Sequence, residues 1–236
     1  MLINLDAKQL EFVCAAYVSK DKVAYEEILK GLDIHSANQQ RFGLPERVIA
    51  KVFLFRLIYG GSAFSYAHDP EFTHVSSSEK FWQGVIDEAY NKYEGLAAWH
   101  NSIVQEVSRT GGLIVPPTHR EYIVFRENGE LPRPKILNYP VQGLGHDLMA
   151  ILRVMLMRRL TRAKVSSKLV STVHDSVLFD CPQDSVSTVC RLIFQASQDL
   201  PEQFERLFQK KFDLPFRVEV KVGPNWGDMT EVKETD

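Results

Sequence analysis

Four side chains recur at every fourth position between residues 47 and 59: Arg47, Lys51, Phe55 and Tyr59. In an α-helix a step of four residues advances about 400° and rises roughly 6 Å, so these side chains form one slowly drifting stripe about 18 Å long. Two cations, two aromatic rings and the flexible pair at 60–61 follow in that order, which suits a polyphosphate attached to a nucleobase. An ordinary amphipathic helix, with cations on its wet face and rings on its core face, is the alternative.

The composition is that of an ordinary globular protein. The chain has 236 residues, 44% of them hydrophobic and 25% charged, and a formal net charge of -2. It is long enough for one large domain or two small ones. It contains no run of about 18 apolar residues and no signal-peptide pattern, so we expect no membrane span and a cytoplasmic location. Its three cysteines are far apart and fit no metal spacing, which favours reduced thiols.

Positive charge is concentrated between residues 153 and 168, where Arg and Lys recur without an acid. Such a run can be the solvated end of a helix, where cations complement the helix dipole. It can equally contact a phosphate backbone, which acidic residues elsewhere in the chain do not prevent. The sequence alone leaves both interpretations open.

Hydrophobic periodicity predicts an α+β protein with a long helical excursion in its middle. Helical spacing and terminal Gly or Pro predict helices at Lys8–Ser19, Asp21–Lys30, Ile34–Phe42, Pro45–Tyr59, Glu79–Arg109, Gln142–Ala163, Asp184–Asp199 and Glu202–Phe212. Alternating or β-branched segments predict strands at Leu2–Asp6, Glu121–Phe125, Lys168–Val173, Val177–Asp180 and Phe216–Val222.

Two aspartates stand at the ends of apolar strands. Asp6 ends the first, and Asp175 lies in a predicted three-residue hairpin turn with His174 and Ser176. An aspartate at a strand end often only caps a turn. The valines around Asp175, however, predict a buried hairpin, where a carboxylate is costly unless it is paired or binds metal. If the two strands are neighbours, the carboxylates could hold a pair of Mg²⁺ ions about 3.5–4 Å apart, the arrangement of two-metal phosphoryl transfer.

Four motifs and a closing strand, in chain order, resemble family A DNA polymerases, the family of bacterial DNA polymerase I and many phage replicases. They are Asn4–Glu11 (first palm motif), Asp33–His35 with the stripe and Gly60 (fingers motif), Asn138–Gly143 with Asp147 (template–primer motif), Val173–Ser176 (second catalytic motif), and Val218–Val220 with Asn225-Trp226. The resemblance spans essentially the whole chain. It implies a palm with an antiparallel sheet at residues 1–20 and 116–236 and an inserted helical fingers subdomain at 21–115. The family's thumb and exonuclease have no counterpart here.

The implied activity is template-directed DNA synthesis, in which a dNTP is joined to the 3′-OH of a primer. Asp6 and Asp175 would be the catalytic, metal-binding carboxylates, with the backbone carbonyl of Ala7 as a further ligand. The implied cofactor is a pair of Mg²⁺ ions, for which Mn²⁺ would be an acceptable substitute. Lys51 would donate a proton to the pyrophosphate leaving group, where charge develops during the reaction.

The resemblance also implies a nucleotide-binding set, comprising Gln9, Glu11, His35, Arg47, Lys51, Phe55 and Tyr59. The two cations of the stripe and His35 would bind the triphosphate, although His35 taken alone would be read as an ordinary surface histidine. Glu11 would close against the 2′ position of the sugar and reject ribonucleotides. Phe55 would pack under the sugar and, lacking a hydroxyl, would discriminate against dideoxynucleotides. Tyr59 would stack on the templating side.

The implied DNA contacts come from other segments. Asn138 and Gln142 would read acceptors in the primer–template minor groove, where pair shape can be checked without reading sequence. His174 would lie beside the primer terminus, and Gly60 would permit hinge motion at the end of the fingers helix. The expected partners are therefore primer–template DNA and dNTPs.

The sequence departs from the family pattern at three positions. Ser176 stands where the family usually has a second acid, so metal affinity is expected to be weaker. Val13 replaces a frequent arginine after the first motif. Pro134 occupies a position that often holds a DNA-contacting arginine, for which Arg133 or Lys135 would substitute. The essential aspartate pair remains.

The first catalytic motif lies almost at the start of the chain, whereas the family places a thumb, and usually an exonuclease, before it. Because an unpaired apolar sheet edge is an association surface, we expect a split polymerase whose N-terminal half is a separate polypeptide that docks through the palm. An expression fragment is the alternative. Brevity and phage-like details favour a phage protein acting in the cytoplasm of an infected bacterium.

Two other functions remain open. A non-catalytic DNA-binding or scaffold remnant of a polymerase would keep the fold without needing Asp6, Lys51 and Asp175 together. A two-metal nuclease could use the same aspartate pair, but it has no obvious use for the stripe.

Overall fold

The computed structural model describes residues 1–234, which divide into two compact units. The first, here called the sheet unit, comprises residues 1–10 and 144–234, and the second, the helical unit, comprises Glu11–Gly143. The compact units therefore change at 10/11 and 143/144, whereas the expected palm and fingers change at 20/21 and 115/116. The assignment of palm and fingers ranges stays a prediction.

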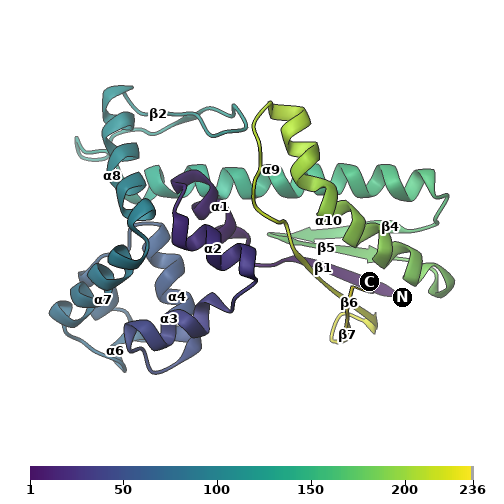
Figure 1. Cartoon of the computed structure of the whole chain (residues 1–236), viewed down its shortest axis with the longest axis horizontal. Helices are drawn as coiled ribbons and strands as arrows, with labels where there is room; N and C mark the ends of the chain where they lie inside the picture. The colour runs from purple at the N-terminus through teal and green to yellow at the C-terminus, as the bar shows by residue number, and fades with distance from the viewer. Residues whose placement is uncertain (235–236) are drawn as a thin grey trace. The chain divides into compact units, whose positions relative to one another are not determined.

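A five-stranded antiparallel sheet organises the sheet unit (Figure 1). Its strands, in spatial order, are β4 (Lys168–Val173), β5 (Ser176–Asp180), β1 (Leu2–Ala7), β6 (Val218–Asn225) and β7 (Asp228–Val232). Along the central strand β1, Ile3, Leu5 and Ala7 are buried while the alternate residues are half-buried. This period of two gives the sheet one core face and one more open face. The predicted α+β class is confirmed, and β7 is a strand that the sequence did not predict.

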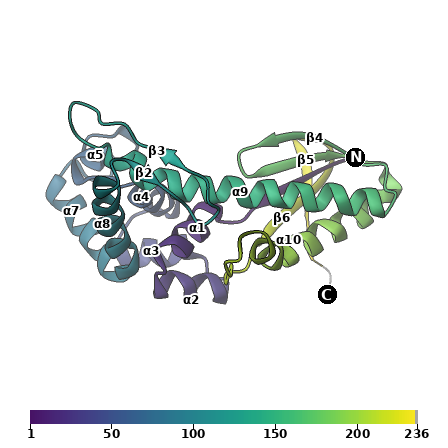
Figure 2. The same cartoon turned by 90° about the horizontal axis from the view of Figure 1, so that it is seen from above.

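One long helix, α10 (Val186–Phe208), packs on β1 and β6 (Figure 2), after a short 3-10 turn, η1 (Gln183–Ser185). Two helices were predicted here, on either side of Pro201, because proline removes a helix hydrogen bond. That prediction is wrong. Ala196, Leu200 and Phe204 form one buried stripe across the proline, and burying it as a single helix outweighs the lost bond. The helix ends at Gln209, which has a left-handed φ of 54°.

The helical unit contains eight named helices and a two-stranded sheet within residues 1–234. They are α1 (Leu10–Ser19), α2 (Lys22–Lys30), α3 (Ile34–Phe42), α4 (Arg47–Ile58), α5 (Ala63–Ala67), α6 (Pro70–Thr73), α7 (Glu79–Lys92), α8 (Glu94–Arg109), β2 (Leu113–Ile114) and β3 (Tyr122–Ile123). The rings of Phe53, Tyr66, Phe72 and Trp82 are fully buried and pack on one another. They form the core on which α4 rests.

Two predicted helices differ from the structure. The segment Glu79–Arg109 is not one helix but two, because Tyr93 leaves the helical conformation and its hydroxyl donates to the buried Oε2 of Glu27 at 2.7 Å. The helix predicted from Gln142 begins earlier: α9 (Arg133–Arg162) runs through Pro140. Pro140 and its neighbour Val141 are buried, so packing again keeps a proline within a helix.

A buried polar network ties three segments of the helical unit together. Lys92 Nζ forms an ion pair with Glu27 Oε1 at 2.6 Å and donates to Asn38 Oδ1 at 2.6 Å. The Tyr93 hydroxyl completes the network by accepting from Asn38 Nδ2 at 3.1 Å. A buried charge needs such partners, because removing one leaves the other uncompensated in a low-dielectric interior.

Two further features concern the apolar length of the helices and the state of the three cysteines. Of the helices in the part of the chain that the structure describes, none is long and apolar enough to cross a membrane. Cys14, Cys181 and Cys190 are free and buried, and burial raises the pKa of each thiol.

Candidate active site

Of the two predicted catalytic aspartates, Asp6 lies on β1 of the sheet unit and Asp175 lies in the turn just before the neighbouring strand β5. β1 pairs with β5 in a register that sets Asp6 opposite Ser176. The backbone N–H of Ala7 donates to the carbonyl of Asp175 at 3.1 Å, which holds the β4–β5 turn against the end of β1. The sequence predicted that Asp6 and Asp175 could share a metal site if their strands are neighbours, and β1 and β5 are neighbours.

The turn itself is shorter than predicted. Ser176 belongs to β5, which leaves His174 and Asp175 as a two-residue turn, with His174 in the left-handed region at φ 52°. The predicted buried hairpin is also wrong for β4, where Val170 and Val173 are 51% and 43% exposed, because β4 is an edge strand. Asp175 and Asp6 are both half-buried, so each carboxylate remains partly accessible to a ligand.

Negative charge gathers around Asp6 on the open face of the sheet. Glu219 of β6 lies directly opposite Asp6, and like charges in such a pair are unfavourable unless a cation compensates them. Lys221 does so in part: its Nζ lies 2.5 Å from Glu219 Oε2, and Glu219 first, with Asp6 further away, raises the pKa of the Lys221 ammonium.

Asp6 and Asp175 supply few ligands for a metal ion. Among residues 1–234 no group of three or more His, Cys, Asp or Glu side chains is arranged to hold a metal ion. Mg²⁺ nevertheless prefers oxygen ligands and is often bound through one or two carboxylates, with substrate phosphates and water as the others. Two half-buried carboxylates, one on β1 and one in the adjoining β4–β5 turn, fit that pattern.

The first cation of the stripe is held by an acid of the helical unit. Arg47 makes a two-pronged ion pair with Asp33, with Nε and Nη2 at 2.8 and 3.0 Å from its oxygens. Asp33 also caps α3, since its carboxylate accepts from the backbone N–H groups of His35 and Ser36. The guanidinium of Arg47, followed by the hydroxyl of Ser36, holds the pKa of Asp33 well below its usual range.

Phe55, the first ring of the stripe, lies close to both Lys51 and His35. Lys51 Nζ is 5.7 Å from the centre of the Phe55 ring, and the ring of His35 meets Phe55 edge-on at 5.6 Å. His35 is 4% exposed, so the surface-histidine interpretation is wrong, and its Nδ1 has no hydrogen-bond partner within the described chain. Burial, with the nearby charges of Arg47 and Lys51, lowers the pKa of His35 to about 4.

Tyr59, at the end of the stripe, joins a polar cluster with Glu11 and Gln142. The Tyr59 hydroxyl donates to Glu11 Oε1 at 2.7 Å, and Gln142 Nε2 donates to the same oxygen at 2.5 Å and to Tyr59 Oη at 2.6 Å. Burial and then the Glu11 carboxylate raise the pKa of Tyr59, which keeps its hydroxyl protonated as a donor. The sequence predicted separate contacts for these residues, and no local pattern links positions 11, 59 and 142.

The other predicted residues flank these clusters. Gln9 lies in the turn after β1 with φ 56°, and Asn138 is one helical turn before Gln142 on α9. Gly60 has φ 82°, and a Cβ there would lie 2.9 Å from Leu137 Cδ1. The position therefore requires glycine for both conformation and space.

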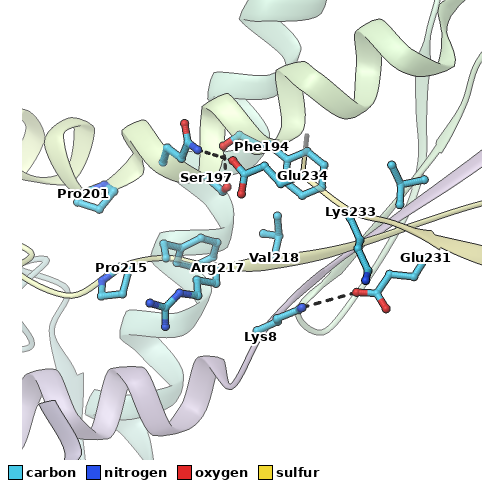
Figure 3. Close-up of a pocket in the computed structure, with 13 residues that line it drawn as sticks. Lys8, Phe194, Ser197, Pro201, Pro215, Arg217, Val218, Glu231, Lys233 and Glu234 are labelled. Atoms are coloured by element: carbon cyan, nitrogen blue, oxygen red, sulfur yellow. Dashed lines mark hydrogen bonds and ion pairs between the residues drawn. The ribbon is translucent and has the colours of Figure 1, made fainter. Parts of the chain in front are cut away.

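A groove of about 470 Å³ lies elsewhere in the sheet unit, along α10 and the strands β6 and β7 (Figure 3). Its lining includes Phe194, Pro215 and Arg217, together with Lys8 and Glu231, which form an ion pair at 3.8 Å. The residues that line it include none of the predicted site residues.

Comparisons with known proteins agree on one family. A family model described as DNA polymerase family A matches residues 1–228. DNA polymerase I of Lactococcus lactis subsp. cremoris is 26% identical over 242 residues, which cover 96% of this chain and 26% of that protein. The DNA polymerase of Bacillus phage SP01 is 24% identical over 251 residues, covering 100% of this chain and 27% of that protein. The chain thus spans about a quarter of the length of these relatives.

A solved structure has the same fold. The POL domain of Pol1 from M. smegmatis, determined in complex with DNA primer-template and dNTP, superposes with a TM-score of 0.80 at 20% identity. The match covers 95% of this chain and 40% of that one. At this identity the likeness establishes the fold alone.

Proposed function

The chain belongs to DNA polymerase family A, and we propose that it catalyses template-directed addition of dNTPs to a primer 3′-OH. The observation that carries the proposal is the pairing of β1 with β5, which sets Asp6 beside the turn that contains Asp175. Two-metal nucleotidyl transfer needs protein groups that bind a pair of cations, and one carboxylate on β1 with another in the adjoining turn can serve this purpose.

Asp6, Asp175 and the carbonyl of Ala7 would hold the metal ions, with substrate phosphates as the remaining ligands. Bound Mg²⁺, or Mn²⁺ in its place, supplies stabilisation of the attacking and leaving oxygens. The open face of the sheet leaves the two carboxylates partly accessible, and the acidic neighbourhood of Glu219 favours a cation there.

The helical unit would hold the nucleotide. Arg47 and Lys51, both exposed, bind the triphosphate, and Lys51 donates a proton to the departing pyrophosphate. Phe55 lies under the sugar, while His35, whose ring meets that of Phe55 edge-on, donates a ring N–H to a phosphate. The Glu11 carboxylate, held by Tyr59, excludes a ribose 2′-hydroxyl.

Contacts to DNA complete the proposal. Asn138 and Gln142, one turn apart on α9, read the primer–template minor groove. His174 lies at the primer terminus, Gly60 permits hinge motion just beyond α4, and Gln9 approaches the nucleotide from the turn after β1. Because the relatives are about four times as long as the matched region, a separate polypeptide that supplies a thumb is also part of the proposal.

The test is primer extension on a defined primer–template with Mg²⁺, by the wild-type chain and by Asp175→Asn. The proposal expects template-directed growth that the substitution reduces by at least about a thousandfold, since it removes a ligand of the ions that stabilise the transition state. Asp180→Asn, at the other end of β5, is the matched control and should extend the primer at the wild-type rate.

Other outcomes separate the alternatives. Cleavage without growth supports a two-metal nuclease. DNA binding without either reaction, unaffected by Asp175→Asn, supports a scaffold remnant. Efficient extension by this chain alone, as a single species in solution, rules out the need for a separate thumb polypeptide.

A further inference from the structure

The C-terminal end of α4 is held by a side chain from another helix. The last carbonyls of a helix have no intrahelical partner and must find one elsewhere. Those of Arg56 and Leu57 accept from backbone N–H groups just beyond the helix, at residues 59–61. The carbonyl of Ile58 instead accepts from Nε2 of His100, in α8, at 3.0 Å. Both Ile58 and His100 are almost completely buried, so bulk water cannot replace His100 as the hydrogen-bond donor to this carbonyl.

The contacts of His100 fix its tautomer. A carbonyl only accepts, so Nε2 must carry the hydrogen, and Nδ1 is then the acceptor in a neutral ring. Nδ1 lies 3.0 Å from the hydroxyl of Tyr90, which donates to it. Burial, reinforced by the charge of Arg133, lowers the pKa of His100 to about 4, in keeping with a neutral ring at neutral pH.

Tyr90 connects this pair to the first turn of α9. The guanidinium of Arg133 is hydrogen-bonded to the Tyr90 hydroxyl, and the same side chain lies against Gly60, where a Cβ would be 3.6 Å from Arg133 Nε. A continuous polar chain thus runs from Arg133 through Tyr90 and His100 to the carbonyl of Ile58. It ends one residue before Tyr59.

We propose that His100 is a positioning residue for Tyr59: by holding the Ile58 carbonyl it fixes the end of α4, and with it the hydroxyl that donates to Glu11. The consequence for the reaction, accurate rejection of ribonucleotides, rests on the proposed function. The positioning itself does not, because it concerns contacts within the helical unit alone.

A purely space-filling role makes a different prediction. His100 lies on the buried face of α8 with Leu96 and Val107, so the sequence pattern marks it only as a core position. If filling that space were its role, leucine would serve as well as histidine. If the hydrogen bond to Ile58 matters, glutamine, which has an N–H at similar reach, should replace histidine better than leucine does.

Hydrogen exchange of the full chain, read at a peptide covering residues 55–62, tests the positioning directly. His100→Leu should accelerate exchange of the amides at 59–61 at least about fivefold, the effect of leaving one buried carbonyl unpaired. His100→Gln should stay within about twofold of the wild type, since it keeps the donor. His68 also contacts a carbonyl, that of Phe64, but is exposed, so His68→Leu is the matched control and should leave this peptide unchanged.

Primer extension with dNTPs and rNTPs then measures the consequence. The ratio of kcat/KM for dNTP over rNTP should fall at least about fivefold in His100→Leu and recover in His100→Gln, because discrimination follows the placement of Glu11. If His100→Leu does not fold, His100→Asn replaces it: its amide is polar but too short to reach Ile58, and the same losses are expected.

Two results overturn the inference: unchanged exchange at 55–62 in both the Leu and Asn variants, or losses in His100→Gln equal to those in His100→Leu. A wild-type chain that extends no primer contradicts the proposed function instead. The exchange measurement still decides the role of His100 in that case.

Discussion

The hydroxyl of Tyr59 donates a 2.7 Å hydrogen bond to Oε1 of Glu11, across a sequence separation of 48 residues. Gln142 donates to the same carboxylate oxygen. Glu11 is therefore hydrogen-bonded both by the residue at the end of α4 and by a residue of α9. A carboxylate restrained in this way presents a fixed surface, which is what steric discrimination requires. It also links three residues for which the sequence predicted separate contacts.

Shortening Glu11 should open this surface. Glu11→Ala is expected to raise rNTP incorporation relative to dNTP by about 10- to 100-fold, since each 1.4 kcal/mol of discrimination is a factor of ten. Tyr59→Phe, which keeps the ring but removes the donor, should give a smaller change in the same direction. Single-nucleotide kinetics with both substrates measure it; an unaltered ratio in Glu11→Ala removes Glu11 from nucleotide selection.

A hydroxyl added to Phe55 should change terminator use. Phe55 is half-buried beside His35 and Lys51, and a phenol oxygen there could replace a missing 3′-hydroxyl. Phe55→Tyr should therefore raise dideoxynucleotide incorporation by about tenfold or more, the worth of one hydrogen bond involving a charged group. Competition between ddNTP and dNTP on one template measures the effect. Phe64→Tyr is the control, because Phe64 is exposed, and it should leave dideoxynucleotide incorporation unchanged. Phe53 is unsuitable because its ring is fully buried.

Breaking the buried ion pair should destabilise the helical unit. Lys92→Met leaves Glu27 buried beside Asn38 without its cation, which is expected to lower the free energy of unfolding by about 3–5 kcal/mol. Lys80→Met, on an exposed position of the same helix, should cost less than about 0.5 kcal/mol. Urea denaturation compares the two. Adding Glu27→Gln to Lys92→Met should restore part of the loss, and a failure to do so would argue that lost packing dominates.

The neutral state of His100 predicts a pH dependence of stability. Its pKa is about 4 in the folded protein and about 6.5 in an unfolded chain. Above pH 6.5 both states are neutral and the contribution is fully present. As pH falls from 6.5 towards 4 the unfolded chain binds the proton first, so the free energy of unfolding falls, on the order of 2–3 kcal/mol in all.

His100→Gln removes this titration. Its free energy of unfolding should therefore decline less than that of the wild type between pH 7 and pH 4.5, while His35, which has the same pKa direction, continues to contribute in both proteins. Urea titrations at several pH values measure the difference. Parallel declines in the two proteins would show that His100 does not titrate in this range.

Local sequence patterns were a reliable guide where the signal itself is local. Alternation predicts the strand that ends near Asp6, and helical spacing predicts the helix that carries the stripe. The glycine after that helix has the positive φ that glycine adopts most easily. Motif order was equally sufficient for the family, because it depends on residue identity alone. The helix stops were less reliable: Pro140 and Pro201 lie inside helices whose buried stripes continue across them.

The sequence by itself thus determined most of the helices and strands and the family, and it named the residues proposed to carry the chemistry. Tertiary structure decided which of those residues meet. The Lys92–Glu27 pair, the Tyr59–Glu11–Gln142 cluster and the bond from His100 to Ile58 join positions 42 to 131 residues apart. The physical reason is that a buried polar group must find a partner, and which one it finds depends on how distant helices pack, information that no local spacing contains.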